Sequence, residues 1–351
     1  MIDSNSNCNP PLLQDYAQLV HKLQSHVAVD QCEEEGNKMM MMVQEECELP
    51  LIDLGVLITS ESSSDEASKR ECMAKIAMAS SEWGFFQVVN HGVSSELLRK
   101  MREEQIKLFR APFEKKASYA LLNSSYRWGT PTATCPKQFS WSEAFHIPLA
   151  KISDQASYGD FTSLREVMVE YAEAMQGVAK LLAGVLAMKM GSPKQVLEEI
   201  CDENTCFLRL NRYPACPISP EIFGLVPHTD SDFLTILHQD EVGGLQLMKD
   251  SKWVAVKPNA DALIVNIGDL FQAWSNDAYK SVEHKVMVKR KVERFSIAYF
   301  LCPSYESEIG SCKREPSASV YKAFTFGQYR HQVREDVKFI GHKVGLSRFR
   351  V

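Results

Sequence analysis

The sequence lacks the features of several large classes of protein. Ten cysteines occur in 351 residues, but no two form a Cys-x-x-Cys pair, which favours reduced thiols over a disulfide scaffold. The net charge of −6 offers no basic surface of the kind that binds nucleic acid. We therefore expect a chain with free thiols and no nucleic-acid partner.

A long hydrophobic run and a secretion signal are also missing. The most apolar helix-like stretch, near 178–190, is interrupted by Lys180 and Lys189 and is too short and too charged to span a bilayer. Residues 1–11 lack the basic start and apolar run of a signal peptide. We expect no membrane contact and a location in the cytoplasm, with the nucleus as a second compartment. The sequence gives no indication of oligomeric state.

The chain is expected to have four parts. Residues 1–48 include four consecutive methionines, show no sustained amphipathic period and predict a poorly ordered leader. Residues 49–200 predict an N-terminal region of helices and substrate loops, with 112–158 rich in loops. Residues 201–305 predict the core. Residues 306–351 predict a C-terminal loop and helix.

Short β-like runs separated by turns follow Thr205. Eight runs at this spacing predict a mainly β protein with flanking helices, whose core is a double-stranded β-helix, or jelly roll. The expected strands span 206–213, 225–228, 233–238, 244–248, 253–256, 262–267, 282–288 and 295–302. Before them, the patterns predict strands at 49–54 and 83–92 and helices at 67–83, 94–109 and 161–190, and a last helix is expected at 325–337.

His228, Asp230 and His284 form the main candidate site. Positions i and i+2 of an extended segment face the same way, so His228 and Asp230 can both point into the mouth of the barrel. His284 follows 54 residues after Asp230, far enough for the chain to return to the same rim. Two imidazoles and one carboxylate bind Fe(II) and leave coordination positions open. The three residues are therefore predicted metal ligands and catalytic residues.

A second His-x-Asp shows that the spacing alone proves little. His238 and Asp240 repeat it, but a turn follows directly, so we expect a structural or solvent-facing role for His238. His91 lies at a strand–turn boundary without an acidic neighbour, and a structural hydrogen bond is the favoured interpretation.

Arg294 and Ser296 alternate onto one face of the last core strand. A guanidinium can bind a carboxylate through two parallel hydrogen bonds, and a Ser hydroxyl can donate a third. This chemistry suits the distal carboxylate of 2-oxoglutarate. Asn211 and Tyr213 lie on the first core strand. The Tyr213 hydroxyl can donate to the same cosubstrate, or Tyr213 can simply be a strand aromatic before Pro214.

From Leu49 to Val351 the chain resembles the plant 2-oxoglutarate-dependent dioxygenases. Within them, 126–134, 139–148 and 343–349 are similar to segments of gibberellin 2-beta-dioxygenases of the subgroup that acts on twenty-carbon gibberellins. The wider resemblance rests on Trp83–Gly92, Asn211–Cys216, His228–Asp232, Gly243–Gln246, Val265–Asp269, Ser281–Lys285 and Arg294–Ser296. Ala215 departs from the pattern, since many relatives have a second Pro there.

The resemblance implies an activity and a set of cofactors. His228, Asp230 and His284 would bind Fe(II), and 2-oxoglutarate would be bound by Arg294, Ser296, Tyr213 and Asn211. The chain would consume O2, with ascorbate as the reductant. It would hydroxylate a gibberellin at carbon 2 and inactivate it, while 2-oxoglutarate is decarboxylated to succinate and carbon dioxide.

A rigid diterpenoid carboxylic acid requires aromatic walls and a cationic anchor. The expected substrate contacts are Arg127, Trp128, Trp141, Phe145 and Phe300. Arg127 is either the anchor of a substrate carboxylate or the partner of Glu143 in a structural salt bridge. His146 is expected to be a packed loop residue.

Three alternative functions stay open. The chain could oxidise another gibberellin position or another plant metabolite with the same chemistry. It could be a zinc hydrolase, although that leaves Arg294 and Ser296 without a purpose. It could also be a non-catalytic jelly roll that only binds a ligand.

Overall fold

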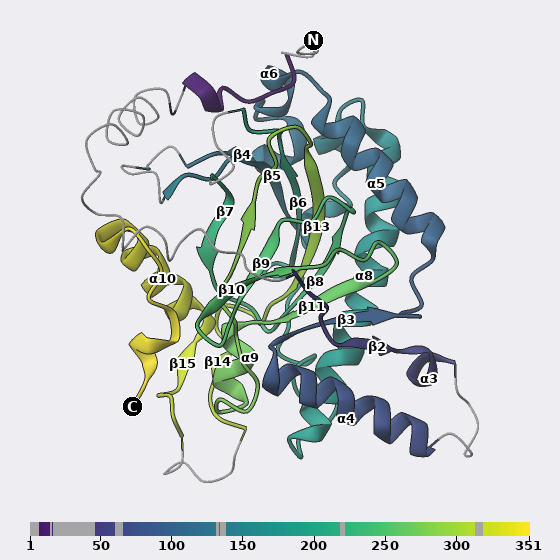
Figure 1. The fold of residues 1–351 in the computed structure, drawn as a ribbon, viewed down its shortest axis with the longest axis vertical. Helices are drawn as coiled ribbons and strands as arrows, with labels where there is room; N and C mark the ends of the chain where they lie inside the picture. The colour runs from purple at the N-terminus through teal and green to yellow at the C-terminus, as the bar shows by residue number, and fades with distance from the viewer. Residues whose placement is uncertain are drawn as a thin grey trace.

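Two β-sheets face each other at the centre of the structure, a computed structural model that describes residues 7–14, 16, 46–59, 66–130, 133, 138–217, 222–312 and 319–351. Helices line one side of this pair of sheets, and the C-terminal helix lies on the opposite side (Figure 1). Within the described ranges, no helix has both the length and the apolar character needed to cross a bilayer.

The larger sheet has eight strands and forms one wall of the cavity that lies between the two sheets. Its order is β2 (Leu51–Asp53), β3 (Phe85–Val89), β11 (Leu263–Ile267), β8 (Leu234–Gln239), β13 (Arg294–Leu301), β6 (Phe207–Tyr213), β5 (Glu143–Pro148) and β4 (Tyr126–Trp128). All neighbours are antiparallel except β2 and β3. The strands alternate side chains between the cavity and the helical layer.

The smaller sheet supplies the opposite wall. Its order is β1 (Glu46–Cys47), β10 (Lys252–Val256), β9 (Leu245–Lys249), β12 (His284–Met287) and β7 (Phe223–His228). A separate two-stranded sheet pairs β14 (Glu308–Ile309) with β15 (Phe324–Thr325). The predicted jelly roll is confirmed, and each of the eight predicted core strands is present with small shifts at its ends.

Three long helices cover the outer face of the larger sheet. They are α4 (Glu66–Glu82), α5 (Ser95–Phe109) and α8 (Thr162–Lys189), and α8 contacts β8 and β13 directly. The Ser94 hydroxyl accepts from the Leu97 amide and starts α5, as the sequence predicted. Shorter helical elements are α3 (Gly55–Ile58), α6 (Phe113–Lys116), η3 (Leu121–Ser124), α7 (Leu149–Ile152), η5 (Gln155–Tyr158) and α9 (Asp269–Trp274).

The C-terminal region ends in α10 (Phe326–Ile340) and the 3-10 segment η7 (Gly345–Phe349). Thr325 and Gln328 form a reciprocal capping box at the start of α10. Gly341, with φ of 84°, ends the helix in the left-handed conformation that glycine adopts without strain. The chain can therefore turn back and place η7 against α9 and α10.

One prediction about the first half of the chain needs correction, and another falls mostly outside the described residues. The segment 112–158 was expected to be rich in loops, yet β5 lies inside the larger sheet and pairs with both β4 and β6. The expected leader lies mostly outside the described residues, as does its methionine run. Its described part is packed, because Leu12 and Tyr16 are buried against Phe139 and Trp141. The proposed four-part division stays a prediction.

Both histidines that the sequence marked as structural lie away from the predicted ligands. His238 is buried within β8, on the face of the strand that does not line the central cavity, and burial lowers the pKa of its imidazole to about 4. The His91 ring accepts from the Val93 amide, which is the predicted structural hydrogen bond.

A buried ion cluster joins α6, β5 and β6. The Glu143 carboxylate accepts from Lys116 and, at 2.6 Å, from Arg212, and the Tyr126 hydroxyl donates to it as well. Glu143 and Lys116 are fully buried. Lys116 also donates to the Cys8 carbonyl, which ties the described N-terminal residues to the sheet. Because two cations converge on one carboxylate, removal of its charge leaves Lys116 without its counter-ion and Arg212 with only the Glu293 carboxylate, 2.9 Å from its Nε.

We expect Glu143→Gln to lower the free energy of unfolding by about 3–5 kcal/mol, the usual cost of breaking a buried ion pair. Urea denaturation of the purified chain measures this change. Asp160→Asn breaks the exposed ion pair with Lys115 and is the matched control, with little expected effect. Equal effects of the two substitutions would contradict the prediction.

Candidate active site

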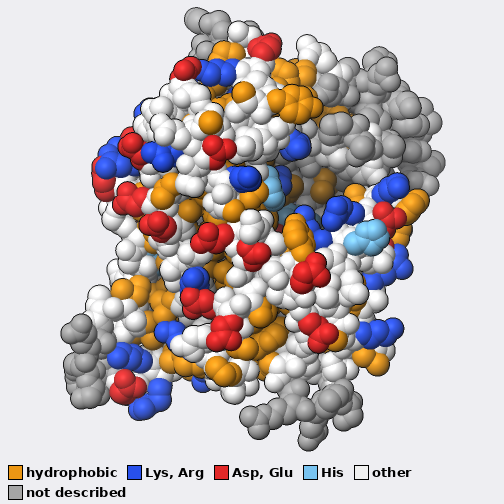
Figure 2. Space-filling model, turned by 180° about the vertical axis from the view of Figure 1, so that it is seen from behind, with side chains coloured by type: hydrophobic (Ala, Val, Ile, Leu, Met, Phe, Trp, Pro, Cys, Tyr) orange, Lys and Arg blue, Asp and Glu red, His pale blue; other side chains and the backbone are white. Residues whose placement is uncertain are grey.

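A cavity of about 320 Å³ lies between the two sheets. This volume falls within the range of about 300–1,000 Å³ typical of small-molecule sites. Figure 2 shows a hollow on one face of the molecule, bordered by basic side chains and a histidine. Most of the exposed wall area is apolar, and its apolar side chains include Phe85, Phe207, Leu225, Leu237, Ile264 and Phe300.

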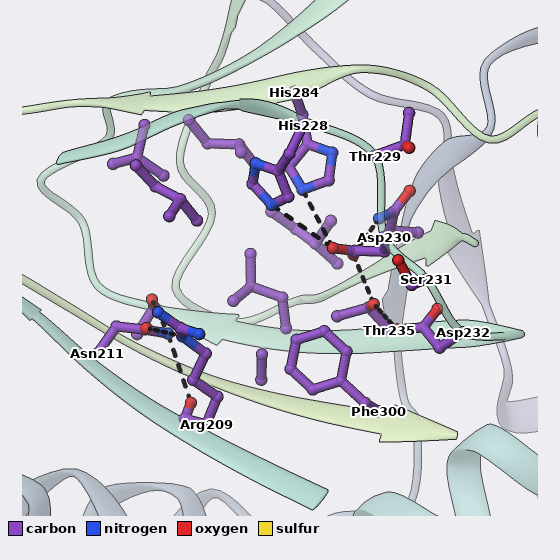
Figure 3. Close-up of a pocket in the computed structure, with 18 of the residues that line it drawn as sticks. Arg209, Asn211, His228, Thr229, Asp230, Ser231, Asp232, Thr235, His284 and Phe300 are labelled. Carbon is purple, nitrogen blue, oxygen red and sulfur yellow. Dashed lines mark hydrogen bonds and ion pairs between the residues drawn. The ribbon is translucent and has the colours of Figure 1, made fainter. Parts of the chain in front are cut away.

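The three predicted metal ligands meet in this cavity. His228 ends β7 and lies opposite His284 at the start of β12, because these strands pair in antiparallel register. Asp230 follows in the loop after β7 and directs its carboxylate between the two rings (Figure 3). The Asp230 Oδ1 is 3.6 Å from His228 Nε2 and 3.7 Å from His284 Nε2. All three donor atoms lie within 4.8 Å of one another.

Backbone carbonyls fix the orientation of both imidazoles. His228 Nδ1 is 2.8 Å from the Val226 oxygen, and His284 Nδ1 is 3.1 Å from the Val282 oxygen. A carbonyl oxygen only accepts, so each Nδ1 carries the hydrogen and each Nε2 keeps its lone pair. This second contact is the usual support of a metal-binding histidine.

Hydrogen bonds also fix the Asp230 carboxylate. Its Oδ2 accepts from the Thr235 hydroxyl at 2.6 Å and from the Asn266 amide at 2.5 Å, which leaves Oδ1 toward the histidines. Burial acts to raise the pKa of Asp230, but His284, His228 and the Thr235 hydroxyl outweigh it and lower that pKa. The carboxylate is therefore ionised at neutral pH.

Burial and the adjacent His228 lower the pKa of His284 to about 4, so its imidazole is neutral at pH 7. Two imidazole nitrogens and one carboxylate oxygen on the same side of a cavity form a donor set that suits Fe(II) with open coordination positions. The residues present therefore fit the expected metal.

The predicted anion-binding residues lie along two paired strands. Arg294 faces Tyr213 and Ser296 faces Asn211 across β13 and β6, and all four line the cavity. The guanidinium of Arg294 donates to the Gln239 side chain at 2.7 Å and to the Ser296 hydroxyl at 3.3 Å. Its buried Nε has no partner among the described residues. The guanidinium of Arg294 is thus held in a fixed direction and still has an N–H donor free of any described partner. Such a group can bind a carboxylate.

Four of the five predicted substrate contacts lie elsewhere. Phe300 lines the cavity, but Trp141 and Phe145 are buried in the core, and Trp128 packs edge-on against Phe113. Phe145 is one of the β5 residues that face the helical layer, where it meets Phe109. These aromatic residues were predicted from nearness in sequence, which does not determine which strand face they occupy.

Arg127 is exposed and donates to the carbonyls of Ser124 and Tyr126. It is not among the described residues that line the cavity. The alternative salt bridge with Glu143 is also wrong, because Glu143 belongs to the buried cluster with Lys116 and Arg212.

Two arginines that the sequence analysis missed line the cavity. Arg209 on β6 donates from Nε to Asn211 at 2.9 Å, and Arg330 reaches in from α10. Neither forms an ion pair with any described residue. Figure 3 shows Arg209 and Asn211 on the wall opposite the metal ligands. The alternation of β6 could have indicated Arg209, since positions 209, 211 and 213 share a face.

His146 also lines the cavity, from β5 and not from a loop. Its ring stacks on Phe207 with centroids 3.9 Å apart, and Phe207 stacks in turn on Phe300 at 4.2 Å. Burial and the nearby charge of Arg209 lower the pKa of His146 to about 4, so the ring is neutral at pH 7. The stack forms a flat aromatic wall beside two cations.

Comparison with known proteins agrees with this geometry. Residues 204–303 match the 2OG-Fe(II) oxygenase superfamily, and residues 49–165 match the family described as non-haem dioxygenase in morphine synthesis N-terminal. The solved structure of JOX2 in complex with 2OG, Fe and JA superposes with a TM-score of 0.70 at 32% identity, covering 90% of this chain and 93% of that one.

Sequence relatives identify the family within this superfamily. Gibberellin 2-beta-dioxygenase 6 of Oryza sativa subsp. japonica is 57% identical over 87% of this chain and 85% of its own length. Gibberellin 2-beta-dioxygenase 8 of Arabidopsis thaliana is 52% identical over 97% of this chain and 98% of its own. The chain uses Fe(II) and 2-oxoglutarate as an oxygenase of this superfamily, and it belongs to the gibberellin 2-beta-dioxygenase family.

Proposed function

We propose that this chain hydroxylates gibberellins at carbon 2, with twenty-carbon precursors as its substrates, and thereby inactivates them. The observation that carries the proposal is one apolar cavity that holds the two-histidine, one-carboxylate set, the Arg294–Ser296 pair and two further arginines. Hydroxylation is coupled to decarboxylation of 2-oxoglutarate to succinate and carbon dioxide, with ascorbate as reductant.

In this proposal His228, Asp230 and His284 hold the iron through Nε2, Oδ1 and Nε2. Bound Fe(II) supplies the activation of O2 that hydroxylation of an unactivated carbon requires. The protein keeps both Nε2 lone pairs free through the backbone contacts of Nδ1. Its apolar walls exclude water from the reacting carbon, which limits side reactions.

Arg294 and Ser296 bind the distal carboxylate of 2-oxoglutarate. The guanidinium provides two parallel donors, including the buried Nε without a described partner. Gln239 holds the other side of the guanidinium and fixes its direction. Tyr213 lies below the guanidinium carbon, 5.0 Å from its ring centre, and Asn211 keeps Arg209 in place.

Arg209 and Arg330 replace Arg127 as the proposed carboxylate anchors. A twenty-carbon precursor has two free carboxylates, one of which is closed into a lactone in nineteen-carbon gibberellins. Two arginines without a counter-ion among the described residues match the charge of the dicarboxylate. The wall formed by His146, Phe207 and Phe300 accepts the flat apolar face of the diterpenoid. The cytoplasm is the proposed compartment.

The metal assignment predicts that His228→Ala and Asp230→Ala abolish gibberellin turnover while the chain stays folded. Purified protein is incubated with a precursor, Fe(II), ascorbate and 2-oxoglutarate, and succinate and hydroxylated product are measured by mass spectrometry. His238→Gln changes the second His-x-Asp and is the matched control, with turnover retained. Full activity of either ligand variant would refute the assignment, and hydroxylated product formed with Zn(II) in place of Fe(II) would refute iron as the metal.

The substrate assignment predicts that Arg330→Leu and Arg209→Met each reduce kcat/KM for a twenty-carbon dicarboxylate roughly 10- to 100-fold. This estimate follows from about 1.5–3 kcal/mol for a hydrogen bond to a charged group. The loss for a nineteen-carbon lactone should be smaller for at least one variant. Arg127→Ala, outside the cavity, is the control and should keep the wild-type KM. Unchanged kinetics in both cavity variants would exclude the anchor role.

A further inference from the structure

The loop that carries Asp230 is held by a polar cluster from the C-terminal region. The Lys343 ammonium donates to the Thr229 carbonyl at 2.9 Å, to the Ser231 hydroxyl at 2.8 Å and to the Asp269 carboxylate at 2.6 Å. These three contacts use all three ammonium hydrogens. The Lys343 side chain therefore contacts the residues on both sides of Asp230.

Asp269 is the centre of the cluster. Its Oδ2 accepts from the Thr229 hydroxyl at 3.0 Å, from the Tyr329 hydroxyl and from Lys343. Its backbone amide donates to the Asp230 carbonyl at 2.9 Å. The carboxylate is nearly inaccessible to solvent, with 4% of its side chain exposed, so these contacts are shielded from water.

Lys343, Tyr329 and Asp269 have no role in the catalytic proposal. Lys343 belongs to the segment between α10 and η7, Tyr329 to α10, and Asp269 to the start of α9. The ammonium also lies 5.5 Å from the centre of the Tyr329 ring. Gly345, with φ of 70°, brings the chain close to Lys343 and Asp269. The packing of this region depends on a separate apolar contact among Phe324, Tyr329 and Phe349.

We propose that Lys343, through Asp269 and Thr229, is a positioning residue that fixes the His228–Asp230 loop in the geometry required for metal binding. Strand pairing fixes His228 and His284, but Asp230 lies beyond the end of β7, where no strand partner holds the backbone. We call the contacts of Lys343 and Asp269 with Thr229 and Ser231 the clamp. The clamp supplies that missing constraint. The inference rests on the proposed ligand role of His228 and Asp230.

Metal binding by the full chain tests the clamp without reference to turnover. Metal-free protein is titrated with Co(II), whose visible absorption bands report both affinity and ligand geometry. We expect Lys343→Met to weaken Co(II) binding roughly 10- to 100-fold, the usual effect of losing a group that orients a metal ligand, and to change the band positions. Lys338→Met, at an exposed position of α10, is the matched control and should match the wild type.

A Lys343→Met protein with wild-type affinity and spectrum would overturn the proposal. If that variant does not fold, the Co(II) titration of Thr229→Val tests the proposal instead. This substitution removes only the hydroxyl that donates to Asp269. Weaker binding with altered bands then supports the clamp, and unchanged binding overturns it. Wild-type protein that binds Co(II) but does not hydroxylate gibberellins would refute the proposed substrate and leave the clamp standing. Wild-type protein that does not bind Co(II) would refute the ligand assignment and the clamp together.

Discussion

The pairing of β7 with β12 is the constraint on which the site depends. Antiparallel register places His228 directly opposite His284, and the backbone carbonyls two residues before each histidine fix the ring nitrogens. Two of the three donor atoms are thus positioned by main-chain geometry, which the folded sheet holds without additional side-chain order. This arrangement places the proposed metal ligands at one rim of the cavity, opposite the wall that holds Arg209 and Asn211.

Charge balance explains the composition of that opposite wall. Asp230 is ionised in an apolar cavity, and a divalent metal with two imidazoles and one carboxylate leaves a net positive charge. Arg294, Arg209 and Arg330 add three cations without a carboxylate partner among the described residues. Unpaired cations are costly where they are buried, as Arg294 is, or half-buried, as Arg209 and Arg330 are. The arrangement is therefore favourable when anions enter, and a keto-diacid together with a carboxylated diterpenoid would supply them.

Strand alternation and the local pattern of the sequence were sufficient for the core strands, the long helices and the convergence of the predicted metal and anion ligands on one cavity. The strands and the ligand positions depend on side chains two residues apart, as with Arg294 and Ser296, and the helices depend on a period of about 3.6 residues. The substrate wall was not predictable in the same way. Trp141 and Phe145 are near Arg127 in sequence but face the core, whereas Arg330 enters from a helix more than a hundred residues after β6. That contact arises only when α10 packs beside the sheets. Glu143 was the expected partner of Arg127 in one alternative, but it pairs with Lys116 of α6 and Arg212 of β6.

The location of α10 links substrate recognition to metal geometry. Arg330 lines the cavity, and the preceding residue, Tyr329, donates to Asp269, which holds Thr229. Consecutive residues on a helix point in different directions, so one rigid element can contact the substrate with one side chain and the ligand loop with the next. A displacement of α10 that followed loss of the substrate carboxylate would reach the Asp230 loop through the Tyr329–Asp269 hydrogen bond and through Lys343, which follows the helix. The sheet fixes the histidines independently of the substrate, whereas the residues on both sides of Asp230 contact Lys343 in the segment that follows the helix.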